Sequence, residues 1–213
     1  MSLLVHKTSY ENAKHNVVPG DAGFPKGVFS SFGYGNFFAD GKISLFTVTG
    51  TYDWNKPFSE ATESLFEFWT LDQNKWKKKE NVFIDDFVGS IHGRKSLVAD
   101  FNGDSIPDIF VANHGYDKPP FPGERNNIVL SQGSGKFLVR HASPEVDFFH
   151  GASAVDLDLD GDIDVAAVTG GTGLQTIYTF LNDGSGNFTK GDNNLFSIPL
   201  PSTLYYTIEF IDL

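Results

Sequence analysis

The sequence predicts an all-β repeat protein, and three observations predict it. A nine-residue acidic loop occurs twice in one register, starting at Asp100 and again 56 residues later at Asp156. Matching Gly-rich hairpin turns follow the two loops, at residues 130–137 and 181–188. The segments between them read as short strands rich in β-branched and aromatic residues. Four-stranded units of this length stack radially, so we expect a β-propeller of four-stranded antiparallel blades, a partial one of about three blades.

Composition agrees with strands and excludes several classes of function. The chain has 213 residues, of which 40% are hydrophobic and 15% aromatic, so disorder is excluded. Its 21 Phe and 22 Gly favour strands and tight turns. A formal net charge of −11 argues against nucleic acid as a partner. No Cys is present, which excludes thiolate metal sites, and no apolar run spans a bilayer, so we expect no membrane insertion.

The strands can be assigned in order around the two loops. Residues 96–101 enter the first loop, 108–115 leave it, and 126–143 form a hairpin. The second unit repeats this order with 151–158, 163–171 and 175–192. Each unit therefore has four strands, with the acidic loop between the first and the second.

An earlier, degenerate copy precedes these units at a shift of 64 residues. Several residue types match at this one shift. Asn36, Asp40 and Ser44 fall on Asp100, Asp104 and Asp108; Phe46 falls on Phe110; Tyr52 and Asp53 fall on Tyr116 and Asp117; Glu60 falls on Glu124. We therefore expect a third blade at residues 31–91.

These repeats divide the chain into five parts. Residues 1–30 are a strand of a preceding blade or a cap, and 31–91 are the degenerate blade without calcium. Residues 92–147 and 148–202 are two blades with an acidic loop. Residues 203–213 are the first strand of a further, truncated blade, so we interpret the chain as a trimmed piece of a longer propeller that lacks its signal peptide. An unpaired strand edge recruits other chains. We therefore expect self-association near Leu204, Tyr206 and Phe210.

The acidic loops are candidate calcium sites. Calcium takes six to eight oxygen ligands in a tolerant geometry, and alternate side chains of a tight loop can converge on one point. We expect two Ca²⁺ sites, each with four side chains and one backbone carbonyl. Site one has Asp100, Asn102, Asp104, Asp108 and the Ile106 carbonyl; site two has Asp156, Asp158, Asp160, Asp164 and the Asp162 carbonyl. Gly161 stands where the turn needs a positive φ, and Ser105 takes that place in site one.

Two other interpretations of the loops were weighed. An EF-hand needs a Glu at position twelve and flanking helices, but that position holds Val111 or Ala167 and the flanks are strands. A solvated turn without metal would leave four carboxylates repelling one another. In the degenerate copy, Phe38 and Lys42 lead us to expect no calcium.

Two further groups of residues are candidates for binding. Six residues come from the long connections at 50–63 and 115–126 and are predicted to form an aromatic platform for a ligand: Tyr52, Trp54, Phe58, Tyr116, Phe121 and Arg125. The alternative is that these loops pack on adjacent blades. His92, His114 and His150 suggest a transition-metal or catalytic site, but we favour a repeated structural His that begins the first strand of each blade.

The segments VADFNGDSIPDIFVA and AVDLDLDGDIDVAAV resemble the FG-GAP/VCBS repeats, which form the propellers of integrin α subunits and of many bacterial secreted or surface proteins. The resemblance covers about residues 30–213. It implies a calcium-stabilised bacterial module, secreted or on the cell surface, that binds a protein or glycan and is not an enzyme. The alternatives are a propeller-type carbohydrate-active lyase or dehydratase, and a purely structural repeat of a large surface protein.

Overall fold

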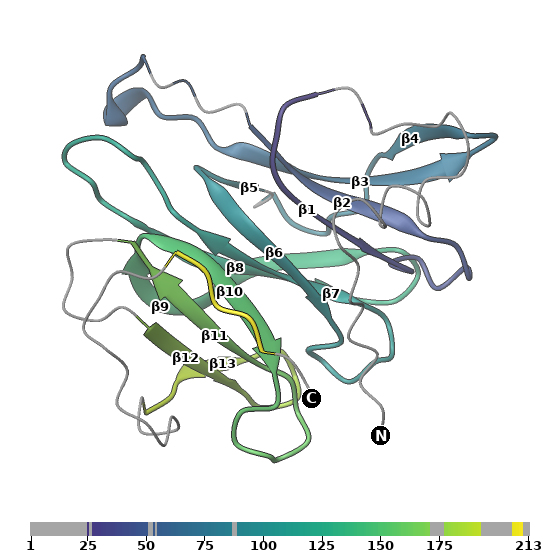
Figure 1. Ribbon diagram of the computed structural model, residues 1–213. Coiled ribbons are helices and arrows are strands. Elements are labelled where there is room, and N and C mark those ends of the chain that lie inside the picture. Colours follow the sequence, from purple (N-terminus) through teal and green to yellow (C-terminus); the bar gives the residue numbers. More distant parts are fainter. Residues whose placement is uncertain are drawn as a thin grey trace.

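The chain folds into three antiparallel sheets, each with its four strands in sequential order (Figure 1). The computed structural model describes residues 25, 27–50, 53, 55–86, 89–170, 177–192 and 206–210. The first sheet holds β1 (Phe29–Gly35), β2 (Ser44–Thr49), β3 (Ser64–Asp72) and β4 (Lys75–Lys79), and β5 (Gly89–Ser90) pairs with β3. The second holds β6 (Gly93–Ala99), β7 (Asp108–Asn113), β8 (Glu124–Ser131) and β9 (Phe137–Asp147). The third holds β10 (Phe149–Val155), β11 (Asp164–Thr169), β12 (Ile177–Asn182) and β13 (Phe188–Lys190).

The second strand of each sheet is buried along its whole length. β2, β7 and β11 read SLFTVT, DIFVAN and DVAAVT, and every one of their residues is buried. A continuous buried run of this kind needs cover on both faces of the sheet. The three sheets are thus three consecutive propeller-type blades, and the all-β prediction is confirmed.

Two hydrophobic cores lie between the blades. Between the first and second sheets the ring of Phe68 stacks on that of Phe137, with centroids 4.2 Å apart. Between the second and third sheets Phe110 packs against Phe180 at 6.0 Å and Phe188 at 5.5 Å. The many Phe residues therefore fill the spaces between blades, because a large flat ring covers two sheet faces at once.

The first strands of successive sheets are neighbours: β1 lies beside β6, and β6 beside β10. Residues 206–210, yellow in Figure 1, continue the series along β10. The Phe210 backbone N–H donates to Ser153 Oγ at 3.1 Å, and a Cβ at Gly151 would lie 2.9 Å from the Tyr206 carbonyl oxygen. No strand is assigned to these five residues, and the first strand of a following blade stays a prediction. Residues 1–24 and Leu204 lie outside the described part of the chain.

Two details differ from the sequence analysis. Phe46 on β2 pairs with Phe68 on β3, whereas its equivalent Phe110 on β7 pairs with Ile128 on β8. Equivalent residues of the first two sheets are therefore 64 positions apart in the second strands but 60 positions apart in the third strands. Glu124, the first residue of β8, therefore corresponds to Ser64 and not to Glu60, which lies in the short 3₁₀ helix η2 (Phe58–Glu60). The match at Glu60 was wrong because the connection after β2 is four residues longer than the one after β7.

The fourth strand of the first sheet is short. β4 ends at Lys79, and the chain then runs beside the start of β9, where the Phe137 N–H donates to the Val82 carbonyl at 2.8 Å. Within the described residues, no helix is long and apolar enough to cross a membrane.

Candidate metal sites and a histidine-lined pocket

The three loops between first and second strands share one backbone shape. Their fourth and sixth positions all have a positive φ, between 50° and 101°. The fourth positions are Ala39, Gly103 and Leu159, and the sixth are Gly41, Ser105 and Gly161. This confirms the positive φ expected at Gly161 and shows that residues 36–44 are a copy of the two acidic loops.

The ninth residue closes each loop through the same hydrogen bond. The Phe101 N–H donates to the Asp108 carboxylate at 2.8 Å, and the Leu157 N–H donates to Asp164 at 2.8 Å. In the degenerate loop the Phe37 N–H donates to Ser44 Oγ at 3.3 Å. In this loop the Ser44 hydroxyl accepts the hydrogen bond in place of a carboxylate, so the loop keeps its shape. Because the hydroxyl carries no charge, the loop has one fewer carboxylate for a metal.

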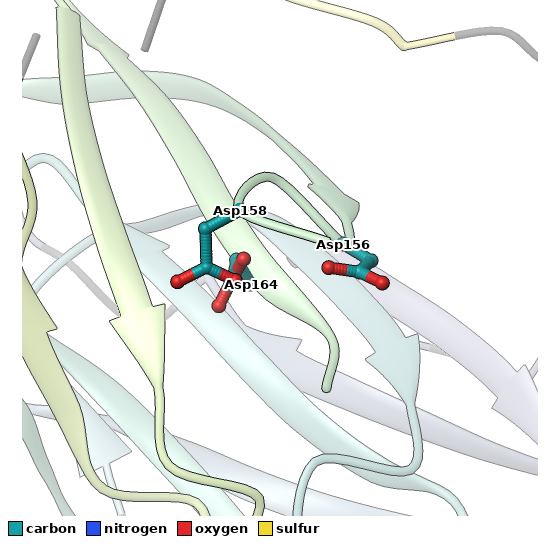
Figure 2. Close-up of side chains that lie close together, drawn as sticks. All are labelled: Asp156, Asp158 and Asp164. Atoms are coloured by element: carbon teal, nitrogen blue, oxygen red, sulfur yellow. The ribbon is translucent and has the colours of Figure 1, made fainter. Parts of the chain in front are cut away.

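The second loop brings three carboxylates together. Asp156, Asp158 and Asp164 each offer an oxygen, and these oxygens lie within 4.8 Å of one another (Figure 2). Asp164 is fully buried, and Oδ1 of Asp156 is buried without a hydrogen-bond partner among the described residues. Asp160 and Asp162 are not part of this group: Asp160 accepts the Asp162 N–H at 3.0 Å, and the Asp162 side chain lies against Gly184. Of the four side chains predicted for site two, Asp156, Asp158 and Asp164 therefore lie together, and Asp160 does not join them.

Electrostatics in this loop disfavour the anions when no cation is present. Burial raises the pKa of Asp164, and backbone N–H donors offset part of that effect. The pKa of Asp162 is also raised, by desolvation and then by the charges of Asp160 and Asp156. A cation at the centre of the loop would remove both penalties.

The first loop is arranged differently. Both oxygens of Asp100 accept backbone N–H groups, from Gly103 at 2.8 Å and from Ser105 at 2.8 Å. Asp104 accepts the Ser131 hydroxyl, and the Asn102 amide donates to the Ser131 carbonyl at 3.1 Å. Among the described residues, no three acidic or His side chains converge here as they do in the second loop.

Asp108 and Ile106 complete the first loop. Burial raises the pKa of Asp108 to about 7, despite hydrogen bonds from the backbone of Ser131 and Phe101. Ile106, the predicted carbonyl ligand, is half-buried in the same turn. Site one therefore keeps its predicted residues in one loop, but its carboxylates are engaged by protein donors.

One residue on the third strand accounts for much of this difference. Ser131 and Asn182 are equivalent, since their N–H groups donate to Asp108 at 2.6 Å and to Asp164 at 2.8 Å. The Ser131 side chain turns to Asp104. The Asn182 amide donates instead to the carbonyls of Phe101 at 2.8 Å and Ile163 at 3.1 Å. The carboxylates of the second loop are thus left without a hydroxyl donor from this strand.

The donor set of the second loop fits calcium. Calcium is a hard cation that prefers carboxylate and carbonyl oxygens. The second loop offers such oxygens, one of them buried and unpaired, whereas thiolate ligands are excluded because the chain has no Cys. Asp156, Asp158 and Asp164 would hold the ion.

Four of the six predicted platform residues are described by the structure, and one of them, Tyr116, is buried. Tyr52 and Trp54 lie outside the described residues. Tyr116 is 1% exposed and its hydroxyl donates to the Lys56 carbonyl, while Phe58 packs on its ring at 5.5 Å. The prediction for Tyr116 is wrong, because its ring is buried where the two connections pack together. Arg125 is exposed on β8, and Phe121 is 50% exposed elsewhere.

The histidines are not a repeated structural feature. The His114 N–H donates to the His92 carbonyl as the Gly170 N–H donates to Phe148, so His92 corresponds to Phe148. His150 therefore stands two residues further along its strand than His92 does. The favoured interpretation was wrong because His-Gly recurs in the sequence at a different register in each blade.

The histidines instead meet across two blades. The ring centroids of His114 and His150 are 4.5 Å apart, and those of His92 and His114 are 5.4 Å apart. Burial lowers the pKa of His92 and of His150 to about 4, with contributions from Arg94 and from His114. Burial lowers the pKa of His114 as well, so all three rings are neutral at pH 7.

His114 and His150 line an open pocket of about 360 Å³. Its other lining residues come from the connection after β7, the start of β10, the end of β11 and the C-terminal segment: Asp117, Phe121, Phe148, Gly170 and Tyr206. Of these, sequence reasoning singled out only Phe121 as a ligand-binding residue. One signal in the sequence could have linked Tyr206 to His150: the two residues are 56 positions apart, the same spacing as the two acidic loops.

Comparison with known families agrees with the loop geometry. Residues 100–167 match the FG-GAP-like repeat, from the first residue of the first acidic loop through the second loop and into β11. No curated protein matched the chain. The resemblance drawn from the sequence is confirmed for residues 100–167, which carry both acidic loops and are similar to the FG-GAP-like repeat.

Proposed function

We propose that this chain is a calcium-binding FG-GAP-like β-propeller module that recognises a protein or glycan outside the cell or at its surface, without catalysis. The observation that carries the proposal is the group of Asp156, Asp158 and Asp164, with ligand oxygens within 4.8 Å of one another.

A cation is needed to make this group stable. Two like charges about 4 Å apart repel by about 1 kcal/mol in water and by about 4 kcal/mol near a protein surface. The loop holds three carboxylates, and only some of their oxygens are engaged by backbone donors. The unpaired Oδ1 of Asp156 supports a ligand in the loop, because buried polar atoms are normally satisfied.

The test is thermal unfolding with calcium or with a chelator. The melting temperature should rise on addition of CaCl₂ and fall with EGTA. Asp158→Ala should weaken this response, because Asp158 is one of the three carboxylates that would hold the ion. No response in either condition would contradict calcium binding.

Asp40→Ala is the matched control. Asp40 accepts the Lys42 N–H at 3.0 Å, as Asp158 accepts the Asp160 N–H at 3.3 Å. Both substitutions remove the same local hydrogen bond, but only the second removes a proposed ligand. Asp40→Ala should therefore keep the full calcium response.

The recognition role is supported by the repeat family and by exposed aromatic side chains. Phe121 and Tyr206 are 50% and 62% exposed, whereas many Phe rings among the described residues are buried between the blades. Exposed rings at a pocket are typical of binding surfaces.

A second candidate function is supported by the same pocket. A carbohydrate-active lyase or dehydratase needs His, Tyr or Arg side chains from several blades at one place. His114, His150 and Tyr206 come together from three segments. Turnover of a bound glycan would favour this enzyme; binding without turnover would favour the recognition module.

A further inference from the structure

We propose that the pocket between His114, His150 and Tyr206 binds a neutral sugar residue through stacking on Phe121 and Tyr206. This inference rests on the recognition role proposed above and gives it a ligand class and a place.

The pocket lies at the opposite end of the blades from the acidic loops. His150 stands at the start of β10 and Asp156 directly follows its end. Six residues at a rise of about 3.3 Å separate them by about 20 Å. His114 and Asp108 bracket β7 in the same way. The pocket is therefore a site distinct from the calcium loops, and its ligand need not touch the ion.

Aromatic rings form the wall of the pocket. The ring of Phe121 meets that of Phe148 edge-on at 6.2 Å, and the ring of Tyr206 lies 5.0 Å from His150. Phe121 and Tyr206 remain largely exposed, whereas Phe149, next along the chain from Phe148, is 0% exposed. The backbone also holds Phe121 at φ 54°, a conformation that bulky residues rarely adopt and that is commonest at functional sites. A strained loop thus presents an apolar ring to solvent beside a cavity.

Two imidazoles and one carboxylate line the rest of the pocket. The imidazoles of His114 and His150 are neutral at pH 7, since burial lowers the pKa of both. Nδ1 of His150 has no hydrogen-bond partner among the described residues. Asp117 adds an exposed carboxylate at the rim. The pocket therefore offers acceptors and donors close to apolar ring faces.

A pyranose ring has the matching chemistry. One of its faces presents C–H groups that pack on an aromatic ring, and its edge carries hydroxyls that both donate and accept. Carboxylate and neutral imidazole groups suit those hydroxyls. A volume of about 360 Å³ lies at the lower end of small-molecule pockets, which suits one sugar unit.

Other ligand classes fit less well. A transition metal needs three converging ligand atoms, and among the described residues the His and Asp side chains of the pocket do not provide them. An anionic ligand would meet the Asp117 carboxylate and uncharged imidazoles. A cationic ligand would be repelled by the charge of Arg94, which acts on all three histidines.

The test is ligand-observed NMR and calorimetry with the whole chain in calcium. The probes are methyl glycosides of glucose, galactose, mannose, fucose and N-acetylglucosamine, followed by a glycan array. We expect saturable binding of at least one of these glycosides or array glycans. A ligand found with the glycosides is a single sugar unit, and one found only on the array is a sugar held in a longer chain.

Variants locate the site. Phe121→Ala should lower affinity at least tenfold, and Asp117→Asn should lower it at least threefold. Ile84→Ala is the control, because Ile84 is a 54% exposed apolar side chain that lies outside the pocket. It should leave the affinity unchanged. Equal losses in Phe121→Ala and Ile84→Ala would overturn the assignment.

The result also separates this inference from the calcium proposal. Folded protein that binds none of the probes, or binds choline in place of sugar with loss in Phe121→Ala, would overturn the sugar site. The calcium response of the melting temperature would be unaffected by that outcome. Conversely, sugar binding without any calcium response would contradict only the metal proposal.

Discussion

The side-chain amide of Asn182 donates a 2.8 Å hydrogen bond to the backbone carbonyl of Phe101, a residue of the first acidic loop that is 81 positions away in the chain. The same amide donates to Ile163 at 3.1 Å, and the Asn182 N–H donates to Asp164. One side chain on β12 therefore joins the two acidic loops and the two blades that carry them.

Replacing Asn182 should destabilise the fold. Asn182→Ala leaves the buried Phe101 carbonyl without its donor, and an unsatisfied buried group costs about 1–3 kcal/mol. Urea unfolding should show a loss of this size. Asn187→Ala is the control, because Asn187 is exposed and bonds only within its own turn, to Asp183. Equal stability of both variants would contradict the bridging role.

Two substitutions in the second loop, Leu159→Gly and Gly161→Ala, should change the free energy of unfolding in opposite directions, because both residues have a positive φ. Leu159 has φ 65° and is 86% exposed, so Leu159→Gly relieves strain and loses little packing. Gly161 has φ 101° with open space around its Cβ position, so Gly161→Ala adds strain without a clash. We expect a gain and a loss of about 0.5–1 kcal/mol in the free energy of unfolding. Urea unfolding in saturating calcium measures both, and a change of the same sign in both would count against the loop geometry.

The histidine cluster should make the fold sensitive to acid. Burial lowers the pKa of His150 from 6.5 to about 4, so between those pH values the unfolded chain binds more protons than the folded one. The contribution of His150 to the free energy of unfolding is then fully present above pH 6.5, and it is lost as the pH falls toward 4. His150→Asn should reduce the loss of stability between pH 7 and pH 4.5. Denaturant unfolding at both values, in saturating calcium, measures the effect.

His141 provides the comparison for this measurement. It is exposed on β9, away from the cluster with Arg94 and Asp117, and burial lowers its pKa as well. His141→Asn should change the acid sensitivity less than His150→Asn does. A larger effect at His141 would place the acid-sensitive group outside the pocket.

The C-terminal segment leads to a prediction about association. No strand is assigned to residues 206–210, although the segment lies along β10. Tyr206 is 62% exposed on this segment, and an apolar ring at an exposed edge favours contact with another chain. Light scattering should show a dimer or larger species, and Tyr206→Lys should shift it toward monomer by adding charge at the edge. Leu65→Lys, at a 45% exposed position on β3, should not. A concentration-independent monomer would contradict the prediction.

Local sequence signals explain why the blades were predictable. The acidic loops and Gly-rich turns fix their own backbone: Gly161 takes the positive φ that the loop needs, and Gly184 and Gly186 do so in the second hairpin turn. These features depend on residues close together in the chain, so a repeat at a fixed period reveals them.

The pocket could not be predicted in the same way, because it depends on contacts between blades. His114 and His150 meet only after β10 packs beside β6, and their spacing in the chain carries no sign of it. The sequence also gives no sign of which aromatic residues are buried. Tyr116 and Phe121 belong to the same connection, but Tyr116 is buried and Phe121 is exposed to solvent. Connections of different length are a further reason. Glu60 was matched to Glu124 at a constant shift, but the connection after β2 is longer than the one after β7, so the two residues are not equivalent.

The most direct test of the calcium account is anomalous scattering from crystals soaked in a lanthanide, which replaces calcium at oxygen sites. The account predicts a strong peak at residues 156–164, bounded by Asp156, Asp158 and Asp164, and a weaker one at 100–108. It predicts no peak at residues 36–44, where Ser44 stands in the ninth position. The absence of a peak in the second loop, or a strong peak at Asp40, would contradict it.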